Sequence, residues 1–469
     1  MSDRIAWIVT NRTPIQERFE DALVSKCGCE VAIVSWNSLL AGELPLGNPQ
    51  WIFVDLTHAE DWEHLPVVQR RLAKVGSLGT AKIAILERGY PLAWVGLADR
   101  VFASAIGVNA SLAEMPRLLA EAVQLAKVKS SRYSSGQREL EIEGRRFFTH
   151  TPALFPIFDK IQRAAEHDFT VLLVGETGTG KTTFARLIHE LSHRRQKRFL
   201  TVACGAMPNE LMGSELFGHV RGAFTGADRD KLGKFDVANG VRLLLDEIDV
   251  LDLEQQANLL RVIESGEFEQ LGSNDTQKVD VRVVGASNQS LERAITHNKF
   301  RADLFFRLNE VKFEIPPLRE RVGDIVPLAT EMIEECCRER NLQVTAIHPD
   351  YLELLHHYAW PGNIRQLRNE VRHSVLFCLD GVLTPNLLSP ALLSEAQEAM
   401  TQSLGATIST GLSGEVAKTE QEAIEDMLQL HDFNRAATAR ALGISRVTLY
   451  NKIRKYRIRM KERRGADEA

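Results

Sequence analysis

A glycine-rich stretch at residues 175–182, with the sequence GETGTGKT, constrains the fold of this chain more than any other feature. The apolar, β-branched run at 169–174 precedes it and indicates a buried strand, and residues 183–189 follow it with helical spacing. A strand, a glycine loop and a helix in this order are typical of a phosphate-binding loop, whose backbone N–H groups and helix N-terminus face phosphate oxygens. The pattern therefore predicts an α/β nucleotide-binding domain.

The polar residues of this loop have expected partners on a nucleotide. Lys181 would reach the β- and γ-phosphates, and Thr182 would hold Mg²⁺ through its hydroxyl. A chance glycine turn before a helix is the alternative, but the complete pattern argues against it. We therefore expect ATP and Mg²⁺ as cofactors, bound by Gly175, Glu176, Thr177, Gly178, Thr179, Gly180, Lys181, Thr182 and Thr183.

Two further strands end in residues suited to phosphate chemistry. An apolar strand ends in Asp246 and Glu247, and we expect it to lie beside the strand that precedes the glycine loop. Asp246 would then orient the water shell of the metal ion, and Glu247 would polarise the attacking water. Paired acids at a strand end are often only solvated, but their position downstream of a phosphate loop favours catalysis. A strand at 281–288 ends in Asn288, which would sense the γ-phosphate unless it belongs to a surface turn.

Between the glycine loop and Asp246 lies a hexamer that is a poor core element. Its glycines allow a sharp or mobile loop around one aromatic residue. An exposed Phe224 would anchor a protein contact, whereas a buried Phe224 would staple the turn, and the residues alone leave both open. The hexamer consists of Gly222, Ala223, Phe224, Thr225, Gly226 and Ala227.

Length and composition set broad limits. The 469 residues are too many for one core and predict two to four domains. The net charge of −5 excludes a whole-chain argument for nucleic acid, so any such site must be local. The six scattered cysteines are typical of reduced thiols. Without a signal peptide or an apolar run of membrane length, we expect a cytoplasmic protein with no membrane partner.

The first 128 residues alternate between short apolar strands and helices. The predicted strands are 5–10, 31–34, 51–54, 82–86 and 101–103, and a helix at 112–126 closes the set. This alternation predicts a parallel sheet covered by helices, and the order resembles a response-regulator receiver domain. Asp55 stands where a receiver carries its phosphoacceptor. However, Thr10 and Asn11 replace the acidic pair that holds Mg²⁺, so we interpret Asp55 as capping a turn.

The C-terminal residues 419–461 predict a helix-turn-helix. Helices at 435–442 and 446–456 are joined by a three-residue glycine turn, and the second helix is locally basic in a net acidic chain. Residues at its front would read base edges, and the later cations would meet phosphates. A basic solvated helix is the alternative. The predicted DNA-binding residues are Arg446, Thr448, Asn451, Lys452, Arg454 and Lys455.

Four motifs together resemble one family. They are the glycine loop, the GAFTGA hexamer at 222–227, Asp246-Glu247 and the sequence WPGNIR at 360–365. They are similar to the AAA+ domain of sigma-54-dependent transcriptional activators, the bacterial enhancer-binding proteins. The C-terminal stretch resembles their Fis-type domain, which dimerises and binds palindromic enhancers. The resemblance implies that ATP hydrolysis drives the GAFTGA loop against sigma-54 and remodels the closed promoter complex.

The resemblance assigns three arginines. Arg301 and Arg307 would be arginine fingers that reach the ATP of a neighbouring subunit, although each is also suited to a surface ion pair. Arg365 would be the second sensor, on a small helical lid at about 326–383. Fingers supplied across an interface imply a ring, by resemblance a hexamer.

The chain also departs from the family pattern. Ala203 stands where an asparagine usually couples the catalytic glutamate to loop position, which puts hydrolysis coupling in question. Thr182 replaces a common glutamate but supplies a metal-binding hydroxyl. Val241, Arg242 and Leu243 replace the small residues usual before the Asp-Glu strand, with no evident consequence.

We therefore predict an α/β fold with a receiver-like doubly wound domain, an AAA+ P-loop domain with a helical lid, and an all-α helix-turn-helix. The predicted segments are a degenerate receiver-like regulatory domain at 1–128, a linker at 129–147, the AAA+ sigma-54 interaction ATPase at 148–385, a linker at 386–418 and the DNA reader at 419–461. The predicted function is a sigma-54-dependent activator that assembles from dimer to hexamer. The alternative is a DNA-binding regulator that uses ATP binding or a nucleotide second messenger to control its assembly without efficient hydrolysis.

Overall fold

The computed structural model of this chain describes residues 4–408, except 46, 74, 76–79, 134–135 and 143–144. The predicted helix-turn-helix at 419–461, with its six DNA-binding residues, lies outside the described residues. In the described part, no helix is long and apolar enough to cross a membrane. The same residues contain no group of three or more His, Cys, Asp and Glu side chains that could hold a metal ion.

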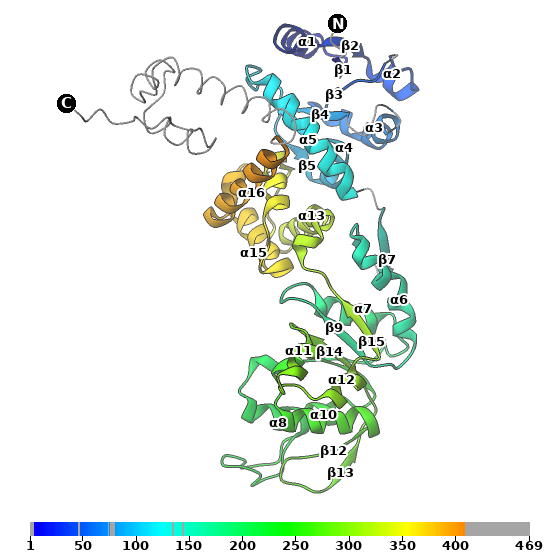
Figure 1. Cartoon of the computed structure of the whole chain (residues 1–469), viewed down its shortest axis with the longest axis vertical. Coiled ribbons are helices and arrows are strands. Elements are labelled where there is room, and N and C mark those ends of the chain that lie inside the picture. The colour runs from blue at the N-terminus through cyan, green and yellow to red at the C-terminus, as the bar shows by residue number, and fades with distance from the viewer. Residues whose placement is uncertain are drawn as a thin grey trace, which may run out of the picture. The chain divides into compact units, whose positions relative to one another are not determined.

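The N-terminal domain is a doubly wound parallel sheet (Figure 1). The strand order is β2-β1-β3-β4-β6, the order of flavodoxin-like folds. The strands are β1 (Ile5–Val9), β2 (Glu30–Val34), β3 (Trp51–Asp55), β4 (Ala81–Leu86) and β6 (Ser104–Gly107). The helices are α1 (Thr13–Cys27), α2 (Trp36–Ala41), α3 (Leu65–Leu72), α4 (Val95–Val101) and α5 (Met115–Tyr133).

The predicted strand at 101–103 is wrong, because Val101 ends α4 and β6 begins only at Ser104. All three residues of that run are buried. A short buried apolar run is compatible with a helix end as well as with a strand, so its composition does not separate the two.

Asp55 is fully buried at the end of β3. It accepts hydrogen bonds from the Thr10 hydroxyl (2.7 Å) and from the backbone N–H of Thr57 (3.2 Å), and it pairs with Arg12 (2.7 Å). The contact to Thr57 shows that Asp55 caps the turn, as expected. Arg12 also pairs with Asp61 at 2.7 Å, so one guanidinium bridges both acids.

Residues 129–147, interpreted as a linker, carry regular structure. They contain the end of α5 and most of the antiparallel hairpin β7 (Arg138–Ile142) and β8 (Arg145–Thr149). Lys129 is buried and pairs with Asp99 (3.0 Å) and with Glu353 of α14 (2.7 Å). The N-terminal domain thus contacts the lid directly, which the sequence pattern did not indicate.

The predicted AAA+ domain is built on a second parallel sheet, with the order β10-β11-β14-β9-β15. Its strands are β9 (Val171–Val174), β10 (Phe199–Ala203), β11 (Val241–Asp246), β14 (Val281–Ser287) and β15 (Val311–Glu314). The expectation that the Asp246 strand lies beside the strand before the glycine loop is wrong, because β14 separates β11 from β9. Hydrophobic pattern identifies core strands but does not fix their order across a sheet. All five strands still present their carboxyl ends at one edge.

Helices cover this sheet and form the lid (Figure 1). The AAA+ helices are α6 (Phe155–Glu166), α7 (Lys181–Glu190), α8 (Asn209–Phe217), α9 (Lys234–Val237), α10 (Leu253–Ser265), α11 (Leu291–Thr296) and α12 (Ala302–Leu308). A hairpin of β12 (Glu267–Glu269) and β13 (Thr276–Lys278) follows α10. The lid helices are α13 (Val322–Arg340), α14 (Pro349–His357), α15 (Asn363–Leu376) and α16 (Pro390–Ile408). α16 occupies much of the stretch 386–418, which the sequence pattern predicts to be a linker.

A short sheet joins the lid to the N-terminal domain. β16 (Ala346–Ile347) pairs in parallel with β17 (Val382–Leu383) and antiparallel with β5 (Tyr90–Pro91). Buried side chains of both domains around these strands belong to one continuous hydrophobic cluster.

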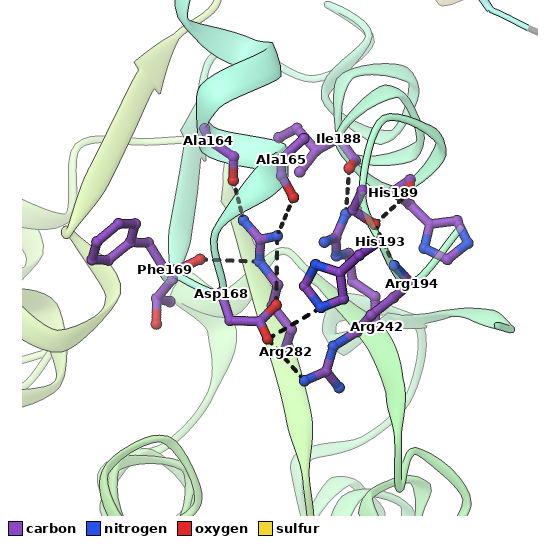
Figure 2. A network of polar contacts seen from close by, with 12 residues as sticks. Ala164, Ala165, Asp168, Phe169, Ile188, His189, His193, Arg194, Arg242 and Arg282 are labelled. Carbon is purple, nitrogen blue, oxygen red and sulfur yellow. Dashed lines mark hydrogen bonds and ion pairs between the residues drawn. The ribbon is translucent and has the colours of Figure 1, made fainter. Parts of the chain in front are cut away.

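Two buried arginines attach neighbouring strands of the AAA+ sheet to helices (Figure 2). Arg282 of β14 lies 3.8 Å from Asp168 and caps the C-terminal end of α6. Its guanidinium donates to the backbone carbonyls of Ala164, Ala165 and Phe169. Arg242 of β11 is fully buried and donates to the Ile188 carbonyl of α7. Arg242, which had no evident role in the sequence, therefore ties the Asp246 strand to the helix of the glycine loop.

The two arginines differ in how well their donors are satisfied. Among the described residues no group accepts a hydrogen bond from Nε or Nη2 of Arg242. Burial, together with the nearby positive charge of Arg282, lowers the pKa of Arg242 to about 9. Burial also lowers the pKa of Arg282 to about 10, but Asp168 opposes that shift.

We therefore expect opposite results from two matched substitutions. Arg242→Met should leave the unfolding temperature of the AAA+ domain unchanged or raised, because an apolar side chain replaces a poorly satisfied buried charge. Arg282→Met should lower that temperature by about 4–8 °C, since it leaves buried carbonyls without donors at a cost of about 2 kcal/mol. Scanning calorimetry of the full chain measures both, and equal losses would contradict this interpretation.

Candidate nucleotide-binding site

A pocket of about 250 Å³ opens at the carboxyl edge of the AAA+ sheet. It combines the glycine loop, the ends of β11 and β14, and the start of α15. Its lining residues are Thr177, Gly178, Gly180, Lys181, Thr182, Thr183, Asp246, Glu247, Asn288, Ile364, Arg365 and Arg368. The pocket thus brings together six of the nine predicted loop residues with both acids, Asn288 and Arg365. The predicted loop residues that do not line it are Gly175, Glu176 and Thr179.

Two glycines allow the loop to take its shape. Gly178 and Gly180 have φ angles of 81° and 103°, in the left-handed region that disfavours side chains. A Cβ on Gly178 would also lie 2.5 Å from the carbonyl oxygen of Gly362, so any side chain there would push the loop away from the lid.

Lys181 is buried at the start of α7, and its ammonium has three acceptors. It donates to the carbonyls of Gly175 (2.7 Å) and Glu176 (3.1 Å) and to Oδ1 of Asn288 (2.5 Å). Burial lowers the pKa of Lys181, and the nearby carboxylates of Asp246 and Glu247 oppose that shift. A phosphate oxygen would therefore meet a charged group that is already held in place.

Asp246 is the last residue of β11 and Glu247 follows it directly, and both line the pocket. Glu247 has a left-handed φ of 59°, and its Oε1 accepts a hydrogen bond of 3.1 Å from Nδ2 of Asn288. Burial raises the pKa of Asp246, and the Glu247 charge adds to that shift. Because Asn288 also accepts a hydrogen bond from Lys181, its side-chain amide connects Lys181 to Glu247.

Ala203 lies opposite Asp246 in the register of β10 and β11. Its methyl group can neither donate to nor accept from Glu247. The side-chain donor that the structure gives Glu247 is Asn288, which directly follows β14 on the other side of β11.

Sequence reasoning missed Asp249. This carboxylate, two residues beyond Glu247, accepts hydrogen bonds from the hydroxyl of Ser287 (3.0 Å), the backbone N–H of Asn288 (3.3 Å) and the side chain of Gln289 (3.0 Å). It therefore fixes the turn that presents Asn288. A third acid so soon after a paired-acid strand end was the available signal.

Sequence reasoning also missed Arg368, which lies one helical turn beyond Arg365 on α15 and lines the same pocket. Residues three apart share a helix face, so the spacing was a usable signal. Arg368 also pairs with Glu335 of α13 at 3.2 Å.

The two predicted arginine fingers and the GAFTGA loop, residues 222–227, do not line this pocket. Arg301 pairs with Asp303 (2.7 Å), and Arg307 pairs with Glu264 (2.8 Å), so within one chain both form surface ion pairs. Phe224 is 38% exposed, and its ring meets that of His219 edge-on with centroids 4.9 Å apart. The Phe224 ring therefore packs partly against the turn and is partly accessible to another protein.

Comparison with known proteins agrees with this architecture. The model of the sigma-54 interaction domain matches residues 147–314, that of the AAA+ ATPase lid domain matches 319–404, and that of the Fis-family bacterial regulatory protein matches 415–456. The regulatory protein AtoC of Escherichia coli K12 is 36% identical over 351 residues, which are 74% of this chain and 76% of AtoC. The chain belongs to the sigma-54-dependent transcriptional regulators.

Further members of this family match at similar levels. The sigma-54-dependent regulator SfnR of Pseudomonas fluorescens is 39% identical over 299 residues, 61% of this chain and 82% of SfnR. A Nif-specific regulatory protein of Azotobacter vinelandii is 41% identical over 281 residues, but the match spans only 54% of its length.

Among solved structures, NtrX of Brucella abortus in complex with ATP has a TM-score of 0.50 and 25% identity. The match covers 97% of this chain and 100% of that one. The predicted fold class and family are therefore confirmed, and this sigma-54-dependent regulator carries an AAA+ ATPase domain and a Fis-type domain. No comparison supports the alternative of a regulator without hydrolysis.

Proposed function

We propose that this sigma-54-dependent regulator binds ATP with Mg²⁺ in the pocket described above, hydrolyses the ATP within a ring, and uses the energy to remodel the closed sigma-54 polymerase complex. The contact of Asn288 with both Lys181 and Glu247 is the observation that carries the proposal. It links the group suited to bind the γ-phosphate with the group suited to activate water. A phosphate that draws Lys181 toward it would change the hydrogen bond that holds Glu247.

The proposed roles follow from the chemistry of each side chain. Thr182 and Asp246 supply the hard oxygen donors that Mg²⁺ prefers, and the bound ion would neutralise phosphate charge. Glu247 would accept a proton from the attacking water, and Arg365 would sense the nucleotide from the lid. Arg301 and Arg307 would act on the ATP of a neighbouring subunit.

The proposed partners are sigma-54 and DNA. The GAFTGA loop, residues 222–227, would push against sigma-54. The six basic and polar residues between 446 and 455 would bind upstream DNA, with two chains forming a dimer on it. The active ring would contain six chains. It would act in the cytoplasm, where the DNA lies.

Phe224 allows the proposal to be tested. In Phe224→Ala, ATP turnover by the full chain should stay within about threefold of wild type, because the loop lies outside the pocket. ATP-dependent formation of heparin-resistant complexes by sigma-54 polymerase should fall by about 10² or more, since a contact aromatic is lost. Phe377→Ala, which removes another exposed aromatic ring, is the matched control. Wild-type protein that forms no such complexes, or a Phe224→Ala variant that forms them normally, would overturn the proposal.

A further inference from the structure

The outer side of the glycine loop is held by groups of the lid and of the turn that leads into it. Glu176 does not line the pocket. Its carboxylate instead accepts two hydrogen bonds from Arg319 (2.9 and 2.7 Å), in the short turn Leu318–Glu320, and one from Nδ2 of Asn363 (3.2 Å). The hydrogen bonds from Arg319 lower the pKa of Glu176.

Three consecutive carbonyls of the loop are held in the same way. Asn363 donates to the carbonyl of Thr177 (3.0 Å), the N–H of Ile364 donates to that of Gly178 (2.9 Å), and Arg321 donates to that of Thr179 (3.2 Å). In a trans peptide the N–H points away from the C=O. Carbonyls turned toward the lid therefore leave the N–H groups of Gly178 and Gly180 on the opposite side, where phosphate oxygens would bind.

Asn363 is the central member of this arrangement. It is fully buried and has a left-handed φ of 51°, which asparagine tolerates better than most residues. Its Oδ1 accepts from the backbone N–H of Leu318 (2.7 Å), so its amide N–H groups face Glu176 and the Thr177 carbonyl. Among common side chains, only an amide supplies one acceptor and two donors in so small a space.

We propose that Asn363 and the Glu176–Arg319 ion pair form a clamp through which the lid shapes the phosphate-binding loop. These are positioning residues: they hold the loop in its phosphate-binding conformation and do not contact the nucleotide. The proposal rests on nucleotide binding in the proposed pocket. It assigns Glu176 the role of contacting the lid, in place of the predicted role of binding the nucleotide. Because coupling between two sites is reciprocal, a bound phosphate would also stabilise the docked lid.

Asn363→Asp is the sharpest test of the clamp. The substitution keeps the size of the side chain and the acceptor for Leu318, but it replaces the donor that faces Glu176 and the Thr177 carbonyl by a negative oxygen. We expect the Kd for a fluorescent ADP analogue to rise by about 10- to 100-fold, and amide hydrogen exchange at residues 176–181 of the nucleotide-free chain to accelerate. An unchanged Kd together with unchanged exchange would overturn the clamp.

A double-mutant cycle on Glu176→Gln and Arg319→Gln provides a second test that does not rely on a buried site. Each single change should raise the Kd by about tenfold, and the double variant should bind no more weakly than either single one. The matched control is the exposed ion pair Arg117–Glu121 (2.8 Å), whose Gln variants should not alter the Kd. Fully additive losses would overturn the clamp.

These measurements separate the clamp from the proposed function. A wild-type chain that binds nucleotide without turning it over would contradict the proposed hydrolysis and leave the clamp standing. The exchange measurement uses the nucleotide-free chain, so it decides for or against the clamp even if no nucleotide binds.

Discussion

Replacing Glu247 by glutamine should reduce ATP turnover of the full chain by about 10²–10⁴ while leaving ATP bound. The glutamine keeps a carbonyl oxygen that can accept the 3.1 Å hydrogen bond from Asn288, so the pocket should keep its shape. The amide cannot take a proton from the attacking water. The rate should therefore be lost at the chemical step, with the Kd for nucleotide within about threefold of wild type.

Turnover measured across protein concentration, together with nucleotide affinity, checks this result. Glu339→Gln, which neutralises an exposed carboxylate on α13, is the control. A Glu247→Gln variant with wild-type turnover would remove Glu247 from the mechanism. A wild-type chain that binds ATP tightly without turnover would instead favour the regulator that uses ATP only to control its assembly.

The second large effect should appear when two inactive variants are mixed. Arg307→Ala should lose about 10³–10⁵ in turnover if the residue acts as an arginine finger. Mixed with Glu247→Gln chains, it should regain activity, because some interfaces then join an intact Glu247 of one subunit to an intact Arg307 of its neighbour. Random mixing of equal amounts in a closed ring predicts recovery to about a quarter of the wild-type rate.

The mixing result separates the two interpretations of Arg307. As a partner of Glu264 in a surface ion pair, it would be worth at most about 1 kcal/mol of stability and nothing in catalysis. Arg261→Ala, which breaks a similar exposed pair with Glu269 (3.1 Å), is the matched control. A mixture no more active than its components would rule out a finger supplied in trans.

The sequence predicted the site better than it predicted the sheet around it. Lys181, Asp246 and Asn288 each follow a strand that the apolar pattern marks as buried. The carboxyl ends of parallel strands lie at one edge, so these residues converge whatever the strand order. That order was not accessible, because β9, β11 and β14 are all buried and mainly apolar, and neighbouring strands pair through their backbone groups.

The remaining groups of the site depend on tertiary contacts between distant segments. Asn363 and Glu176 are 187 residues apart in the chain. Each is unremarkable in its own window, and their distance follows only from how the lid packs on the loop. Asp249 is similar, since its three donors come from the end of β14 and from the turn that follows that strand.

The contact between the N-terminal domain and the lid has a consequence for how the protein comes apart on heating. Lys129 lies between Asp99 of one domain and Glu353 of the other, and β5 completes the sheet of the lid. A chain cut at 148 would deprive Glu353 of Lys129 and expose the apolar face that Tyr90 and its neighbours cover. The smallest unit of the lid that unfolds independently therefore includes residues of the N-terminal domain. A substitution near Asp99 should alter the temperature at which α14 unfolds.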